Sequence, residues 1–106
     1  MISLFKIGTD IVKISRIEKS IKSTSFLKEV YTEGEISHCK NPESLAGIFA
    51  AKEAYFKALG TGIQRPICKV EILYNESGKP YLKGIDNSDV SISHDGEYAI
   101  ATVILW

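Results

Sequence analysis

One stretch, residues 42–59, limits the possible folds of this chain more than any other, because it carries start and stop signals for a long helix. Asn41 can cap the first turn, Pro42 suits the first helical position and Glu43 complements the positive end of the helix dipole. Gly60 can close the far end in a left-handed conformation. We therefore expect one helix over this stretch.

At about 100° per residue, the predicted helix has an apolar stripe formed by Leu45, Ile48, Phe49, Tyr55, Phe56 and Leu59. Lys52 falls inside this stripe, and Glu53 and Lys57 lie one turn apart on its flank. The neighbouring positions on that flank hold small residues, namely Ala46, Ala50 and Gly60. Another group can therefore approach the carboxylate and the ammonium. On this observation alone, the simpler interpretation is an ordinary helix ion pair, worth roughly a few tenths of a kcal/mol.

The composition predicts a single domain over residues 1–106, because a chain of 106 residues builds one core. Thirteen basic and thirteen acidic residues balance, so no net charge recruits nucleic acid or an anionic membrane. The apolar runs are too short for a membrane span and the first residues lack a signal-peptide pattern, so we expect a soluble, cytoplasmic protein. Cys39 and Cys68 have no metal-ligand spacing, which indicates reduced thiols.

The residues before the long helix predict one strand followed by short helices. Residues 4–9 alternate loosely in polarity, which suits a strand with Asp10 at its end. Ser15 and Glu18 have the spacing of a capping box, which predicts a first short helix. The segment Thr32–Glu35 repeats this spacing and predicts a second, polar one.

After the long helix, alternating polarity and turn residues predict strands at 68–74, 81–82, 90–94 and 98–105. The pair Asp95-Gly96 is a tight-turn signal between the last two of them. The order of one strand, several helices and then antiparallel strands predicts an α+β domain. In that fold class the long helix packs on a mainly antiparallel sheet.

Few residues remain as candidates for chemistry. The sequence has no nucleotide phosphate loop, no nucleophile elbow, no cysteine and histidine metal cluster and no dinucleotide fingerprint. The candidates that remain are Asp10, Lys52, Glu53, Lys57 and His94. Two carboxylates are enough for Mg²⁺ when waters and substrate phosphates complete its shell. Periodicity does not show whether Asp10 and Glu53 meet, and a turn or helix cap would also explain Asp10.

Four motifs carry a resemblance to a known family: Ile7-Gly8-Thr9-Asp10-Ile11, Phe49–Ala54 with Lys57 and Gly60–Ile63, Asn75–Pro80, and Ser91-Ile92-Ser93-His94. In this order and spacing the chain resembles the holo-[acyl-carrier-protein] synthases, the short bacterial type of phosphopantetheinyl transferase. The resemblance spans nearly the whole chain. It implies the 4'-phosphopantetheinyl transferase fold, in which one long helix packs on a mainly antiparallel sheet.

The resemblance implies a reaction of fatty acid biosynthesis. Coenzyme A binds through its pyrophosphate, a serine hydroxyl of the apo acyl carrier protein attacks the phosphorus nearer pantetheine, and adenosine 3',5'-bisphosphate leaves. By the same resemblance, Asp10 and Glu53 hold Mg²⁺, and Lys57 lies near the phosphates, where it can stabilise or protonate the leaving group. The general base stays open between Asp10, Glu53 and a metal-bound water.

The resemblance also assigns substrate-binding residues and an assembly. It places Lys52, Gly60, Thr61, Gly62 and His94 in the coenzyme A site. The position of Lys52 on the apolar stripe predicts that its stem packs while its ammonium reaches out. Similar enzymes are homotrimers with active sites at subunit interfaces, where Asp10 and Glu53 of one chain would face His94 or the 60s loop of a neighbour.

A basic first helix is expected to meet the acidic carrier protein through Arg16, helped by Lys13 and Lys22. One departure from the family pattern stands at Ile48, where relatives commonly carry arginine. The exchange either extends the apolar stripe or removes a cation that contacts phosphate, the carrier or a neighbouring subunit. The alternative to an active transferase is therefore a catalytically weak relative that binds coenzyme A or acyl carrier protein without efficient transfer.

Overall fold

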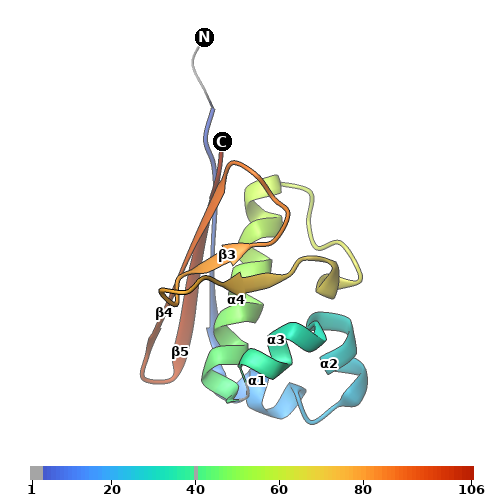
Figure 1. Cartoon of the computed structure of the whole chain (residues 1–106). Coiled ribbons are helices and arrows are strands. Elements are labelled where there is room, and N and C mark those ends of the chain that lie inside the picture. The colour runs from blue at the N-terminus through green and yellow to red at the C-terminus, as the bar shows by residue number, and fades with distance from the viewer. Residues whose placement is uncertain (1–3, 40) are drawn as a thin grey trace.

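The structure, a computed structural model, describes residues 4–39 and 41–106. Figure 1 shows one long helix, α4 (Pro42–Leu59), lying against a sheet, with the shorter helices near its first turns. In chain order the elements are β1 (Lys6–Lys13), α1 (Ile14–Ser20), α2 (Thr24–Val30), α3 (Glu33–His38), α4, the 3₁₀ helix η1 (Ile67–Lys69), β2 (Ile72–Tyr74), β3 (Pro80–Leu82), β4 (Ser88–Asp95) and β5 (Tyr98–Leu105). The predicted α+β class is confirmed. No helix in these ranges is long and apolar enough to cross a membrane.

Three antiparallel strands form the main sheet in the order β1-β5-β4, while β2 and β3 pair separately. Asp10 of β1 lies opposite Ala101 of β5, which lies opposite Ile92 of β4. The prediction that Asp10 ends its strand is wrong, because pairing with β5 continues β1 to Lys13. The predicted tight turn between the last two strands is confirmed, with Gly96 at a φ of 58°.

Helix α4 has the predicted bounds and caps. The Asn41 side chain accepts a hydrogen bond from the Ser44 amide at 2.7 Å, and Gly60 ends the helix with a φ of 77°. Buried small residues at helical spacing form the face toward the sheet: Gly47, Ala50, Ala51, Ala54 and Ala58. A Cβ added to Gly8 of β1 would lie 2.0 Å from the Ala54 carbonyl oxygen. The strand therefore touches the helix backbone to backbone, and only glycine fits there.

The short helices confirm one predicted capping box and exclude the other. The Thr32 hydroxyl accepts from the Glu35 amide at the start of α3, and the Thr32 amide donates to the Glu35 carboxylate in return. Ser15 caps nothing, because β1 runs directly into α1 and Lys13 occupies the cap position without a side-chain hydrogen bond. The first helical amide, from Ile14, donates instead to the Glu97 carbonyl at 2.8 Å.

Two segments differ from the expected elements. No element was expected over residues 24–30, which form the helix α2 with the Ser23 hydroxyl as its cap. The strand expected at 68–74 starts as the helix η1, and only its last three residues pair with β3. Periodicity over so short a segment did not separate these states.

Candidate active site

Asp10 and Lys57 meet between β1 and α4. The Lys57 Nζ donates to the Asp10 Oδ1 at 3.0 Å. Side chains alternate along a strand, so Asp10 shares the helix-facing side of β1 with Gly8. The missing side chain at Gly8 allows the close approach that lets this pair form. The Asp10 side chain is 15% exposed and that of Lys57 is 56% exposed, so the ammonium stays accessible to a ligand.

Glu53 lies one helical turn before Lys57 and completes a group of five charged residues that we call the charge cluster. Burial raises the pKa of Glu53 and the Asp10 carboxylate raises it further, whereas Lys57, Arg16 and Arg65 lower it. These side chains come from β1, α4, α1 and the loop after α4. One further carboxylate and three cations thus act on the charge of Glu53.

The two arginines of the charge cluster are each steadied by a further contact. The Arg16 guanidinium lies over the Phe49 ring, 5.6 Å from its centroid. The Arg65 Nη1 donates to the Glu29 Oε1 at 2.8 Å. Guanidinium groups bind phosphate oxygens well because their donors form a planar fork. The charge cluster therefore suits a ligand that carries phosphate.

The carboxylates of the charge cluster fit Mg²⁺ by their chemistry. Both Asp10 and Glu53 offer the oxygen donors that this ion prefers. Across residues 4–39 and 41–106, no group of three or more His, Cys, Asp or Glu side chains is placed to hold a metal ion. Two carboxylates depend on waters and phosphate oxygens to complete the shell, which is how Mg²⁺ commonly binds. The donor set fits an ion that arrives together with a phosphate-bearing substrate.

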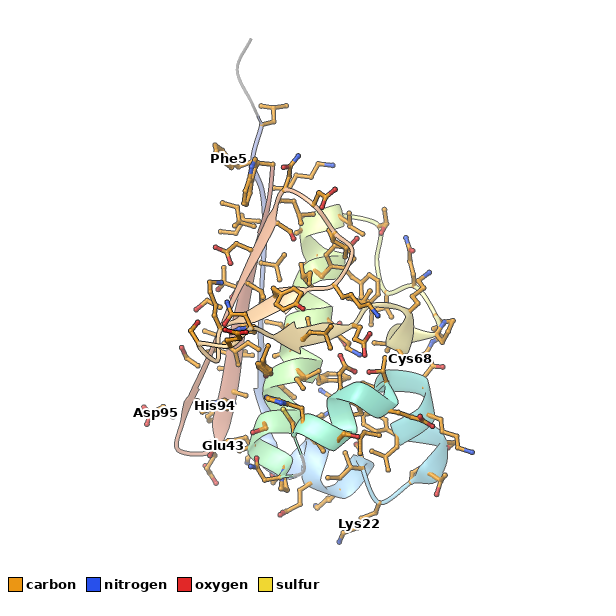
Figure 2. All side chains as sticks on the ribbon, in the orientation of Figure 1. Phe5, Lys22, Glu43, Cys68, His94 and Asp95 are labelled. Carbon is orange, nitrogen blue, oxygen red and sulfur yellow. The ribbon has the colours of Figure 1, made fainter. Side chains whose placement is uncertain are left out.

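His94 lies at the other end of α4. Its Nδ1 is 4.0 Å from the Glu43 Oε1, and the two side chains lie together in Figure 2. Its Nε2 lies 2.9 Å from where a Cβ on Gly47 would be. Glu43 and Lys57 stand in the first and last turns of α4, about 20 Å apart at ~1.5 Å per residue. Within one chain, His94 therefore does not join the charge cluster.

The loop after α4 is open to solvent. Gly60 and Gly62 have φ values of 77° and 76°, and a Cβ added to either would meet nothing within 4 Å. Backbone conformation, and not crowding, requires glycine at both positions. The Gln64 Nε2 donates to the Thr61 hydroxyl at 3.2 Å. This loop carries Arg65, whose positive charge lowers the pKa of Glu53.

The expected basic surface lies on and beside α1. Lys13, Arg16 and Lys22 are all exposed. Lys22 projects from the turn that follows the helix (Figure 2). Only Arg16 of the three also belongs to the charge cluster.

A cavity of about 330 Å³ lies apart from the charge cluster, between β3, β4 and β5. Its lining includes Lys79 and Pro80, which end the motif Asn75–Pro80. Lys79 forms an ion pair with Asp89 on the rim of the cavity. No member of the charge cluster lines it.

Residues 6–103 match the family model of the 4'-phosphopantetheinyl transferase superfamily. The chain belongs to this superfamily. A holo-[acyl-carrier-protein] synthase of Nautilia profundicola is 44% identical over an alignment 110 positions long, which covers 93% of this chain and 97% of that protein. Among solved structures, a holo-(acyl-carrier-protein) synthase of Bacillus anthracis in complex with CoA (3',5'-ADP) has a TM-score of 0.83 and 39% identity, covering 94% of each chain. The Helicobacter pylori enzyme in complex with coenzyme A has a TM-score of 0.82 and 38% identity, covering 92% of this chain and 96% of that one.

In this transferase Lys52 is buried, and the prediction that its ammonium reaches out is wrong. The side chain is 0% exposed, and its Nζ lies 2.7 Å from the Glu35 Oε1 and 2.5 Å from the Val30 carbonyl oxygen. Burial lowers the pKa of Lys52, and the Glu35 carboxylate opposes that effect. The ammonium therefore faces the interior and not a ligand.

Ile48 is also fully buried in the transferase, so the exchange for arginine extends the core. The ion pair of Asp10 with Lys57 forms without a cation at that position.

Sequence reasoning missed two charged residues that matter here. Glu35 was recognised as a capping-box residue, and nothing local pointed to its buried partner Lys52. Arg65 lies in a loop between turn formers, where a charged residue is ordinarily solvent-exposed. Both contacts join segments far apart in the sequence.

Proposed function

We propose that this transferase moves 4'-phosphopantetheine from coenzyme A to a serine of apo acyl carrier protein and releases adenosine 3',5'-bisphosphate. The observation that carries the proposal is the meeting of Asp10 with Lys57 at 3.0 Å beside Glu53. The names of the relatives and the coenzyme A complexes of two similar structures support it. We assign the reaction to fatty acid biosynthesis in the cytoplasm.

Asp10 and Glu53 are the residues that would hold Mg²⁺. When bound there, the ion would neutralise negative charge on the pyrophosphate of coenzyme A. Phosphoryl transfer needs positioning and charge neutralisation more than covalent work by the protein, so a site of charged side chains is sufficient.

The other roles follow from exposure and charge. Lys57 is half exposed and can turn from Asp10 toward a phosphate, where its ammonium stabilises or protonates the leaving group. Glu53 has a raised pKa, which suits it to accept the serine proton. Arg16 and Arg65 add positive charge on the side of Glu53, where a phosphate can be bound.

An assembly of three chains is part of the proposal. The sheet face opposite α4 exposes apolar side chains, namely Ile7 at 68%, Ile11 at 61%, Tyr98 at 45% and Ile100 at 43%. Helix α4 covers only the other face of this sheet (Figure 1). Apolar faces of this kind mark association surfaces. In a homotrimer, His94 of one chain can meet the charge cluster of the next, which explains its distance from that cluster within one chain.

Carrier docking is assigned to the exposed basic residues Lys13, Arg16 and Lys22. Long-range attraction between this surface and an acidic carrier protein speeds their encounter and weakens with salt.

The experiment mixes the protein with Mg²⁺, coenzyme A and apo acyl carrier protein, and measures the carrier by intact mass. The expected result is a carrier heavier by one phosphopantetheine, and none without Mg²⁺. The proposal would be excluded if the mass stayed unchanged for every apo carrier protein of the same organism. Calorimetric binding of coenzyme A without transfer would instead identify the chain as a weak relative that only binds.

A further inference from the structure

A charged network inside the core joins α4 to three other segments. Lys52 and Glu35 are the buried charged residues of the described chain, at 0% and 1% exposure. The Lys52 Nζ donates to the Val30 carbonyl at 2.5 Å and to the Glu35 Oε1 at 2.7 Å. Glu35 in turn accepts from the amides of Thr32 at 2.8 Å and Ile72 at 2.7 Å. Helix α4 is thereby tied to the end of α2, the start of α3 and the start of β2.

The network is complete, since no buried side-chain nitrogen or oxygen in the described residues lacks a partner. A buried ion pair often stabilises a protein no more than well-packed apolar residues of the same size would. Its hydrogen bonds are directional, however, and they fix one arrangement of the groups that they join. The network is therefore better suited to orientation than to stability.

The face of α4 toward the sheet explains why the rotation of this helix has to be fixed by a contact elsewhere. Toward the sheet the helix presents small residues, namely Gly47, Ala50, Ala51, Ala54 and Ala58. Helices normally take their angle and register from large side chains that fit between those of the neighbouring element. A smooth face gives close contact, as at Gly8, but resists rotation and sliding less.

Lys52 directly precedes Glu53, and at about 100° per residue the two side chains point in different directions. Lys52 is held in the core, and Glu53 belongs to the charge cluster. We infer that the Lys52–Glu35 ion pair is a positioning device, which fixes the rotation of α4 and thereby places Glu53 and Lys57 against Asp10. This inference rests on the proposed function, since it assumes that the charge cluster handles the substrate.

The test separates positioning from stability. Lys52→Met alone leaves the Glu35 carboxylate buried without a cation, so this variant is expected to melt at a lower temperature. Adding Glu35→Gln removes that charge and keeps an amide oxygen for the backbone donors. The double variant is expected to recover most of the melting temperature. It is also expected to bind Mg²⁺ in the presence of coenzyme A at least about tenfold more weakly and to lose at least about tenfold in kcat, because small displacements of reacting groups are costly.

The control is Leu82→Ala, which weakens the core on β3 beside Ile72 but removes no hydrogen-bond donor or acceptor of the network. It is expected to have a lower melting temperature but to keep the kcat and the Mg²⁺ affinity of the wild type while folded. The inference would be overturned if the double variant regained its melting temperature and also had the kcat and the Mg²⁺ affinity of the wild type. If the double variant does not fold, Glu35→Gln alone decides, since wild-type kcat in that folded variant would contradict a positioning role.

A metal-free measurement keeps this inference apart from the proposed function. Amide resonances of residues 51–57 are expected to shift and broaden in the double variant and not in Leu82→Ala. Unchanged resonances would overturn the inference. If the wild type neither binds Mg²⁺ nor transfers phosphopantetheine, the proposed function fails, and these resonances alone decide whether the ion pair orients α4.

Discussion

Replacing Lys57 with methionine is expected to change two measured quantities in opposite directions. Lys57 occupies the Asp10 Oδ1 and competes with Mg²⁺ for this carboxylate. The Lys57 side chain is 56% exposed and that of Asp10 is 15% exposed. Because solvent screens their attraction, this ion pair contributes about 0.5–1 kcal/mol. Removing that competition corresponds to about two- to fivefold tighter Mg²⁺ binding in the absence of coenzyme A. Transfer should nevertheless slow by at least about 10²-fold, because a cation that stabilises the leaving group is lost.

Calorimetric titration of Mg²⁺ into the protein without coenzyme A measures the first effect, and the mass of the carrier over time measures the second. The chain offers a matched control in Lys83→Met. Lys83 lies 3.4 Å from Glu71 with similar exposures of 63% and 20%, so its removal takes away one comparable ion pair elsewhere. Unchanged or weaker Mg²⁺ binding in Lys57→Met would refute competition at Asp10. Near-normal transfer would remove Lys57 from the chemistry.

Three further outcomes are expected. Because burial and Asp10 raise the pKa of Glu53, its charge costs stability once pH rises above the ordinary glutamate range. Glu53→Gln should therefore raise the melting temperature at neutral pH but not below about pH 4, while transfer falls at least ~10²-fold; equal melting temperatures at neutral pH would contradict the shift. Gly8→Ala should destabilise by about 1–3 kcal/mol or more in urea unfolding, because its Cβ meets the Ala54 carbonyl, and wild-type stability would exclude that contact. Lys22→Glu should raise the KM for carrier roughly severalfold at low salt and leave the KM for coenzyme A unchanged; an equal effect on both would refute carrier docking at α1.

Elements whose signals are local were predicted well. The bounds of α4 follow from Asn41, Pro42 and Gly60, which act within one turn of the residues they affect. The capping box at Thr32 formed for the same reason. The equivalent spacing at Ser15 failed because the preceding strand leaves no free turn to cap. A local signal is thus reliable only where the neighbouring element leaves room for it.

The charge cluster was predicted in part. The sequence by itself determined that Glu53 and Lys57 share one flank of a long helix, because helical spacing is a property of adjacent turns. Only the tertiary structure decided that Asp10 meets Lys57 across 47 residues, that the Arg65 charge acts on Glu53, and that Lys52 turns inward. These contacts depend on where separate elements pack. That packing is set by the backbone contact of β1 with α4 and by buried charges finding partners, neither of which is visible in a stretch of a few residues.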